Sequence, residues 1–178
     1  SGIENIFNKE ILDNNFIEFI NKSQIPTISK YILGNDIKLE LSRYHVTSKF
    51  SHCGKWHRDQ RDQTSIQFQY YIFDEQGIQL IPGSHKRLNT KVEDEKLNKS
   101  QCSVLNESVH LKVKAGQLLI FHPDILHRGI SLEKRANMHF AISKVHNFIA
   151  NHPIKPVKNL SSEWNELLFS SNENKNIP

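Results

Sequence analysis

Cysteine is scarce in this sequence, and it has no long apolar run. The two cysteines, Cys53 and Cys102, cannot make a disulfide framework and belong to no CxxC pair. We therefore expect a reducing, cytoplasmic setting. No apolar run approaches the roughly 20 residues that a membrane-spanning helix needs. We therefore expect no membrane partner.

Dense runs of one charge are also missing. The chain has 23 Lys and Arg against 19 Asp and Glu, a formal charge of +4. The cations are scattered, unlike the basic stripe of a protein that follows a phosphate backbone. We expect a solvated basic surface and no nucleic-acid partner. The length of 178 residues predicts a single domain, and the sequence carries no signal for an oligomeric state.

Short strands separated by turns fill the middle of the chain. Alternation is clearest in residues 64–73, where apolar side chains point one way and mainly polar ones the other. The apolar set is Ile66, Phe68, Tyr70 and Ile72, and the opposite set is Gln67, Gln69 and Tyr71. Further strands are expected near residues 38–41, 77–81, 111–113, 118–121 and 138–142, and helices near 3–21 and 160–169. Many short strands indicate a sandwich or barrel and not a βαβ sheet.

Residues 87–108 form a polar, charged and weakly periodic segment, for which we expect a long loop with a short helix. Its large apolar residues are chiefly Val92, Leu97, Val104 and Leu105, too few for a core of its own. One interpretation is a disordered surface loop. The other is a lid over the barrel mouth that becomes ordered when substrate binds and excludes water. Loops carried on a rigid barrel often hold binding residues, which favours the lid.

The sharpest feature of the sequence is WHRD at residues 56–59. On a strand, side chains two positions apart point the same way, so His57 and Asp59 can reach one ion. An imidazole and a carboxylate are two of the three ligands in the facial triad of non-haem Fe(II) oxygenases. His127, which follows the run 116–121 and a turn, is our candidate for the third. A lone HxD motif is more often part of a polar surface strand than of a metal site, so it needs further support.

Other histidines and cysteines near these residues compete for the same role. His122 is the main rival of His127, but it lies five residues earlier across a proline, so both should not face one metal. Cys53, four residues before His57, is more typical of a small core residue than of a ligand or nucleophile. We therefore take His57, Asp59 and His127 as the candidate metal ligands and catalytic centre.

Three segments in order resemble the phytanoyl-CoA dioxygenase family of Fe(II)/2-oxoglutarate enzymes, which includes ectoine hydroxylase-like members. They are WHRD at 56–59, GIQLIPGSHK at 77–86 and GQLLIFHPDILHRG at 116–129. With the strands between them they cover roughly residues 38–145, most of the chain. The resemblance implies a mainly β double-stranded β-helix, a cupin-like jelly roll with flanking N-terminal and C-terminal helices. We place its core at about residues 38–148.

The resemblance also implies the cofactors Fe(II), 2-oxoglutarate as co-substrate, and O2. The family places an arginine for the distal carboxylate of 2-oxoglutarate on the strand after the distal histidine, and Arg135 takes that position here. A guanidinium suits the role because it binds a carboxylate with two hydrogen bonds and stays charged. Arg128 is a weaker competitor, because adjacent residues on a strand point to opposite faces.

The sequence departs from the family pattern at secondary contacts to the co-substrate. Many members carry serine two residues after the distal histidine, where this chain has Gly129. A further lysine contact is common in the family, and its counterpart stays open among Thr47, Lys49 and Lys55. Gln67 and Gln69 are possible helpers, although half-buried glutamines on strands are more often structural.

The family resemblance implies hydroxylation of a small-molecule substrate that the sequence does not identify. A carboxylate at Asp59 supports this reaction, because halogenating relatives lack that ligand. One alternative is a nucleic-acid or nucleoside oxidising relative, since Arg135 and Asn137 resemble part of an Arg-x-Asn motif. The second arginine of that motif is Ala141 here, which weakens this alternative. The other alternative is a non-catalytic jelly-roll binding module, which iron-dependent turnover of 2-oxoglutarate would exclude.

Overall fold

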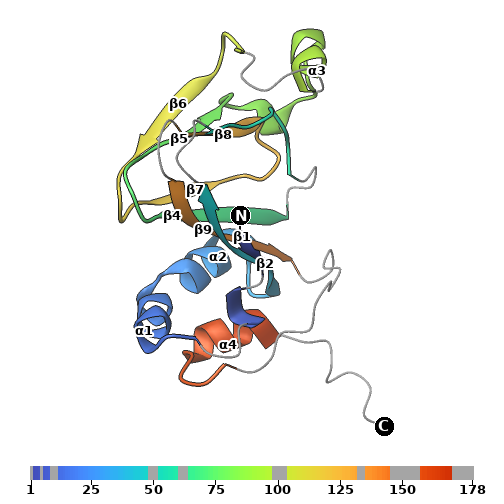
Figure 1. Cartoon of the computed structure of the whole chain (residues 1–178). Coiled ribbons are helices and arrows are strands. Elements are labelled where there is room, and N and C mark those ends of the chain that lie inside the picture. Colours follow the sequence, from blue (N-terminus) through green and yellow to red (C-terminus); the bar gives the residue numbers. More distant parts are fainter. Residues whose placement is uncertain are drawn as a thin grey trace.

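The protein is built from two antiparallel sheets that face each other, with helices covering the outer side of one sheet (Figure 1). The computed structural model describes residues 2–4, 6–8, 12–47, 52–59, 64–97, 104–131, 135–144 and 157–169. The expectations for Lys49, for residues 98–103 of the charged segment and for the tail from residue 170 fall outside these ranges. The arrangement confirms the expected jelly roll with flanking helices.

The nine described strands divide into one sheet of five and one of four. The larger sheet has the order β1 (Gly2–Glu4), β2 (Ile37–Thr47), β9 (Arg135–Lys144), β4 (Ser65–Tyr71) and β7 (Leu118–Phe121). The smaller has the order β3 (His52–Cys53), β8 (His127–Ser131), β5 (Glu75–Leu80) and β6 (Val109–Val113). Neighbours in each sheet lie far apart in the sequence, as in a roll.

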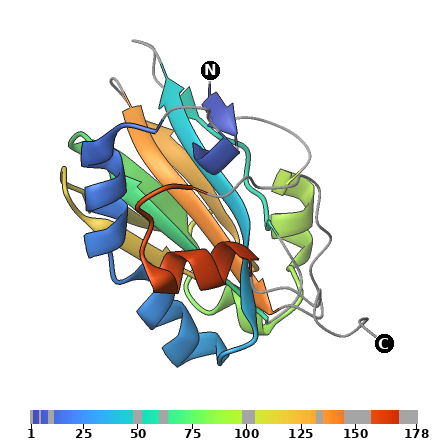
Figure 2. The ribbon, with the colours of Figure 1, turned by 90° about the horizontal axis from the view of Figure 1, so that it is seen from below.

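The main core lies between the five-stranded sheet and three helices that cross its outer face (Figure 2). These helices are α1 (Asn14–Lys22), α2 (Ile25–Leu33) and α4 (Ser162–Phe169). The apolar positions of β4, such as Ile66 and Phe68, belong to this core, as the alternation predicts. Trp164 of α4 is fully buried there, and its indole N–H donates to the Ile20 carbonyl at 2.8 Å. Gln67 and Gln69 therefore face the space between the two sheets.

A β-bulge between Leu39 and Leu41 reverses the faces of β2. Leu39 lies opposite Ile142 and packs in the helix-facing core. Without the bulge, all odd-numbered residues of β2 would share that face, because side chains on a strand alternate. Beyond the bulge, Arg43 and His45 instead line the space between the sheets.

The N-terminal helix is shorter than its apolar pattern predicts. Residues 2–4 pair with β2 instead, and a short 3-10 helix, Ile6–Asn8, follows. Helix α1 starts only at Asn14, after Asp13, whose carboxylate accepts hydrogen bonds from the backbone N–H of Asn15 and Phe16. That cap sets the start of the helix. No helix in the described parts of the chain is long and apolar enough to cross a membrane.

The described parts of the charged segment 87–108 contain the short helix that we expect, α3 (Lys91–Leu97). A short 3-10 helix, Ser84–Lys86, precedes it. Thr90 and Glu93 form a reciprocal capping box, with the Thr90 N–H donating to the Glu93 carboxylate at 2.7 Å and the Glu93 N–H to the Thr90 hydroxyl at 3.2 Å. Arg87 adds two hydrogen bonds to the same carboxylate, each of 2.7 Å. The start of α3 is therefore firmly fixed.

Candidate metal centre and polar pocket

His57, Asp59 and His127 meet between the two sheets, as the sequence predicts. One ligand atom from each residue lies within 4.8 Å of the others. His57 Nε2 lies 3.3 Å from one Asp59 carboxylate oxygen, and His127 Nε2 lies 3.6 Å from the other. Among the described residues, this is the group of three that could hold a metal ion. Two imidazoles and one carboxylate match the donor set of the facial triad for Fe(II).

Backbone hydrogen bonds hold the segments that carry these ligands. His57 and His127 exchange two of them, of 2.9 and 3.0 Å, and so form an isolated bridge. His127 is the first residue of β8, so the expectation that it lies on a strand beside the HxD residues is confirmed. The expectation that His57 and Asp59 share one regular strand is wrong. Asp59 lies in a bend, where its N–H donates to the Pro123 carbonyl at 3.0 Å.

Each imidazole is oriented by a carbonyl of its own segment. Nδ1 of His57 lies 2.8 Å from the Lys55 carbonyl, and Nδ1 of His127 lies 2.8 Å from the Ile125 carbonyl. A carbonyl can only accept, so Nδ1 carries the proton in both neutral rings. Nε2 is then left with a lone pair in each ring and faces Asp59. A metal ligand needs this tautomer, and the backbone provides it before any metal arrives.

The charges of the three side chains also suit a metal. When His57 is protonated, its Nε2–H donates to Asp59, and this hydrogen bond raises the pKa of His57, although burial partly opposes this. Burial, together with the nearby His57, lowers the pKa of His127 to about 4, so this ring is neutral near pH 7. Burial disfavours the Asp59 carboxylate. In acid, however, both histidines are protonated, and their positive charges, together with hydrogen bonds from His57 and Gln67, hold the pKa of Asp59 well below the usual range. The metal-free centre thus holds an ionised carboxylate between two histidines.

Metal binding should release a proton in mildly acidic solution, and the proton should come from His57. Its pKa is raised, so below that pKa the metal-free protein carries a proton that a ligand must lose. The apparent affinity for Ni(II) should therefore fall about tenfold per pH unit below this pKa and stay level above it. Titration calorimetry in buffers of different ionisation enthalpy counts the protons. A count of zero at pH 6 would contradict the assignment of His57 as a ligand.

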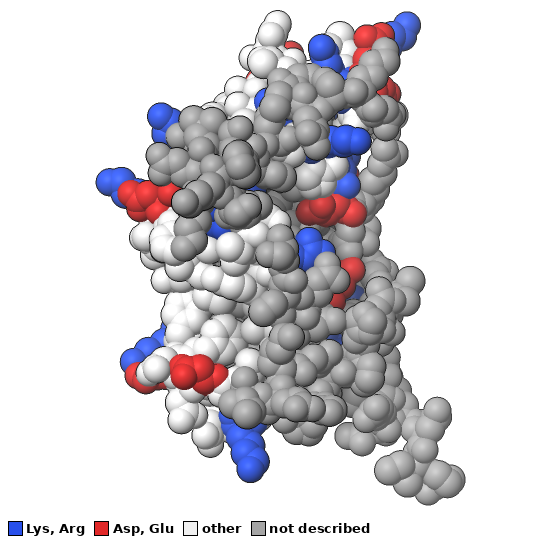
Figure 3. Space-filling model, viewed as in Figure 1, with Lys and Arg blue, Asp and Glu red and all other residues white. Residues whose placement is uncertain are grey.

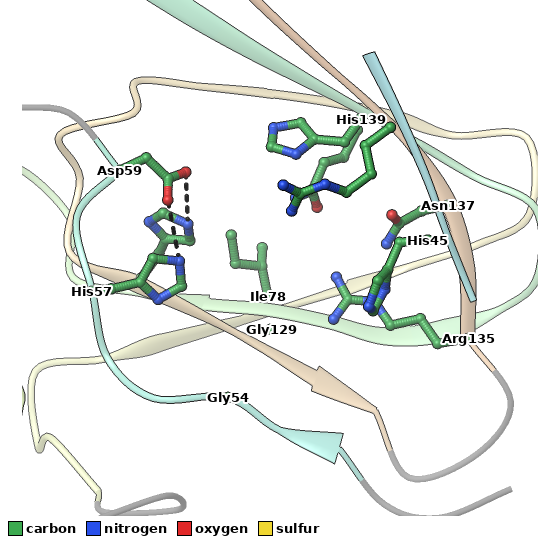
Figure 4. Close-up of a pocket in the computed structure, with 12 residues that line it drawn as sticks. His45, Gly54, His57, Asp59, Ile78, Gly129, Arg135, Asn137 and His139 are labelled. Atoms are coloured by element: carbon green, nitrogen blue, oxygen red, sulfur yellow. Dashed lines mark ion pairs between the residues drawn. The ribbon is translucent and has the colours of Figure 1, made fainter. Parts of the chain in front are cut away.

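The triad opens into a cavity of about 180 Å³ between the sheets. The polar residues of its lining beyond the triad are Arg43, His45, Gln69, Arg135, Asn137 and His139. Figure 4 shows His57 and Asp59 at one end of this pocket, with Arg135, Asn137 and His45 at the other. Ile78 is the large apolar side chain of the described lining. The cavity therefore suits a small polar molecule that spans from the triad to a cation.

Arg135 is buried, with 6% of its surface exposed, and lines the far end of the pocket. With the Asn137 amide turned so that its oxygen faces the guanidinium, it accepts from Nε and Nη2 of Arg135 at 3.0 Å each. Gly129 makes room for this arrangement, because a Cβ there would lie 2.3 Å from Nη1 of Arg135. Many family members carry serine at this position. In this chain, Gly129 leaves the space that the Arg135 guanidinium occupies.

The two rival residues point elsewhere. Arg128 is 2% exposed, but its guanidinium lies over the Trp56 ring, 4.7 Å from the centroid, and its Nε donates to Gln79 at 2.8 Å. It is not part of the pocket lining. His122 stacks on His85 with 5.0 Å between ring centroids, and it too lies outside the lining and the triad. The alternation of strand residues accounts for the different directions of His127 and Arg128.

Sequence reasoning missed several pocket residues. Arg43 and His45 are carried by β2, and their Cα partners in β9 are His139 and Asn137. The four side chains therefore form two adjacent rows on the inner face of the sheet. The sequence of β9 does indicate which face its polar residues occupy, because Asn137 and His139 alternate with Met138 and Phe140 of the apolar core. The residues of β2 gave no such signal, because the bulge changes their face.

Several known structures have a similar fold. EctD from S. alaskensis with 2-oxoglutarate and 5-hydroxyectoine is 16% identical with a TM-score of 0.61, over 82% of this chain and 57% of that chain. HygX from Streptomyces hygroscopicus with iron bound is 12% identical with a TM-score of 0.62, over 83% and 73%. EvdMO1 is 13% identical with a TM-score of 0.61, over 81% and 35%. Such low identities establish the fold alone.

Family membership rests on the sequence. A search of curated proteins gave no match. This chain spans only 35% and 57% of the EvdMO1 and EctD chains. The family model described as "Phytanoyl-CoA dioxygenase (PhyH)" matches residues 4–131, which include all three residues of the triad. The chain therefore belongs to the phytanoyl-CoA dioxygenase family.

Proposed function

We propose that this protein is an Fe(II)- and 2-oxoglutarate-dependent dioxygenase that hydroxylates a small molecule. The observation that carries the proposal is the pocket itself, with three metal-type ligands at one end and the buried Arg135 at the other. A keto acid with a distal carboxylate could bind both ends at once. Related structures support the cofactors, because the structure of EctD contains 2-oxoglutarate and that of HygX contains iron.

The proposed roles follow from the geometry. His57, Asp59 and His127 would hold Fe(II) on one face and leave the other positions for 2-oxoglutarate and O2. Iron bound there would supply the oxidative chemistry, in which one atom of O2 enters succinate, with loss of CO2, and the other enters a C–H bond as hydroxyl. Arg135 would pair with the distal carboxylate of 2-oxoglutarate inside the pocket. The carboxylate of Asp59 favours hydroxylation because it fills the position that halogenating relatives leave open.

The exposure of the three ligands indicates from which side the primary substrate would approach. The side chain of His127 is 5% exposed, whereas that of His57 is 47% exposed and that of Asp59 is 29% exposed. The co-substrate would therefore lie on the deep side, next to Arg135, and the primary substrate would approach past His57 and Asp59. We propose that a small molecule enters here.

The surface charge favours a small molecule over a nucleic acid as the substrate. On the face in Figure 3, the described Lys and Arg are interspersed with Asp and Glu and form no continuous basic track.

The segment 87–108 would act as a lid over this opening. Arg58, between two of the ligands, donates to the Asn89 side chain at 2.9 and 2.7 Å, and Asn89 donates to Asp94 of α3 at 2.8 Å. Amide hydrogen exchange in residues 87–108 should therefore slow when the true substrate joins iron and 2-oxoglutarate. Exchange that is unchanged during turnover would contradict the lid and place specificity in residues 43–56, because the N-terminal helices pack on the outer face of the sheet, away from the pocket.

The test of the function is a metabolite screen that measures succinate release from 2-oxoglutarate. The iron-loaded protein should release succinate, and one class of small molecule should stimulate the release and gain an oxygen atom. Protein without iron is the control. Failure of the iron-loaded protein to consume 2-oxoglutarate with any compound would favour the alternative of a non-catalytic jelly-roll module.

A further inference from the structure

A chain of hydrogen bonds runs from Asp59 across the inner face of the five-stranded sheet. The side-chain amide nitrogen of Gln67 donates to Oδ2 of Asp59 at 2.7 Å. The amide oxygen of Gln67 lies 3.0 Å from Nε2 of His139. Gln67 belongs to β4 and His139 to the neighbouring β9. Two strands of the sheet therefore support the carboxylate, although Asp59 itself belongs to no strand.

The direction of every hydrogen bond in this chain is determined by chemistry. An ionised carboxylate can only accept, so the amide of Gln67 must turn its NH2 group toward Asp59. Its oxygen then faces His139 and can only accept, so Nε2 of His139 must carry a proton. Nδ1 of a neutral His139 is consequently unprotonated. One orientation of Gln67 and one tautomer of His139 satisfy the chain.

Burial holds the two residues of the chain in place. Gln67 is 4% exposed, and burial lowers the pKa of His139 to about 4, so its ring is neutral near pH 7. Phe121 stacks on the His139 ring, with centroids 6.5 Å apart and planes at 19°. The same phenylalanine meets the His127 ring edge-on, with centroids 5.1 Å apart. His139 is thus linked to Asp59 by hydrogen bonds and to His127 by aromatic packing.

We propose that Gln67 and His139 are positioning residues that orient Asp59 for metal binding. The inference rests on the proposed function, since it assigns a role in the same iron site. Gln67 occupies one oxygen of the carboxylate and directs the other toward the side of His57, whose Nε2 lies 3.3 Å from it. His139 prevents the amide of Gln67 from turning over. Neither residue would touch the metal.

Removing the amide of Gln67 should weaken metal binding. Partners that orient a metal ligand typically contribute about 10- to 100-fold in affinity, and we expect a loss in that range for Gln67→Met with Co(II). The Co(II) absorption spectrum should also change, because the carboxylate is no longer fixed. His139→Leu should cause a smaller loss, and the double variant should lose less than the sum of the two. Additive losses would refute a common chain.

Gln69→Met is the matched control. Gln69 lies on the same strand and inner face, but it accepts from the Tyr71 hydroxyl at 2.7 Å and has no described contact with Asp59. Its substitution should leave the Co(II) affinity and spectrum unchanged. Equal losses in Gln67→Met and Gln69→Met would reduce the effect to general packing and overturn the proposal.

A measurement without metal separates this inference from the proposed function. Nitrogen-15 NMR of the metal-free protein should show His139 neutral, with its proton on Nε2, at pH 7. The tautomer should become mixed in Gln67→Met. A wild-type proton on Nδ1 would overturn the hydrogen-bond chain. Wild-type protein that has the expected tautomer but binds neither Co(II) nor Fe(II) would instead overturn the proposed iron site, and the positioning role with it.

Discussion

Replacement of His127 by alanine should abolish iron binding. His127 is the deepest of the three candidate ligands, with a side chain that is 5% exposed, and the two that remain are open to solvent. Loss of a direct ligand should exceed the effect of losing a residue that only orients one, which is about 100-fold at most. Titration calorimetry with Fe(II) under anaerobic conditions, or with Ni(II), measures the affinity. Circular dichroism checks that the variant is folded.

His122→Ala is the control for that experiment. His122 is the nearby alternative in the sequence, but its ring stacks on His85 outside the pocket. Its Nδ1 accepts a hydrogen bond from the Asp124 backbone N–H at 3.1 Å. We expect wild-type metal affinity from this variant. Loss of metal in His122→Ala with retention in His127→Ala would reverse the assignment of the third ligand.

The parts of the fold that follow a local period could be predicted from the sequence. Ile66 and Phe68 alternate with Gln67 and Gln69, and this pattern alone placed one pair in the core and the other on the inner face. The convergence of the metal ligands was different. The HxD motif and a later histidine suggested it only weakly, since no local rule joins positions so far apart, and the resemblance of the segments around residues 57 and 127 to a family motif supplied the main support.

The parts that depend on register between distant strands could not be predicted. Arg43 and His45 enter the pocket because one bulge in β2 changes the face of the residues that follow it. The bond between Gln67 and His139 requires β4 to pair with β9 and joins residues 72 positions apart in the sequence. Amphipathic patterns carry information about faces, but they carry none about which strands are neighbours.

Arg135→Ala should sharply weaken the binding of 2-oxoglutarate and leave metal affinity nearly intact. The guanidinium is buried at the end of the pocket opposite the triad, so its removal would leave a desolvated carboxylate without a partner. Loss of such a contact costs about 2–5 kcal/mol. At about 1.4 kcal/mol for each tenfold change, the dissociation constant should rise by a factor of about 30 to several thousand. Calorimetry measures the affinity for Ni(II) on the metal-free protein and the affinity for 2-oxoglutarate on the Ni(II)-loaded protein.

Two further variants separate the shape of the guanidinium from its charge and its position. Arg135→Lys keeps the charge but loses the two-pronged contact, so it should recover only part of the affinity. Gly129→Ala keeps the arginine but displaces its guanidinium, because the new Cβ would lie 2.3 Å from Nη1. The side chain is flexible at that end, so we expect weaker 2-oxoglutarate binding with little change in the free energy of unfolding. Wild-type affinity for 2-oxoglutarate in both Arg135→Ala and Gly129→Ala would place the distal carboxylate elsewhere in the pocket, with Arg43 and His45 as the next candidates.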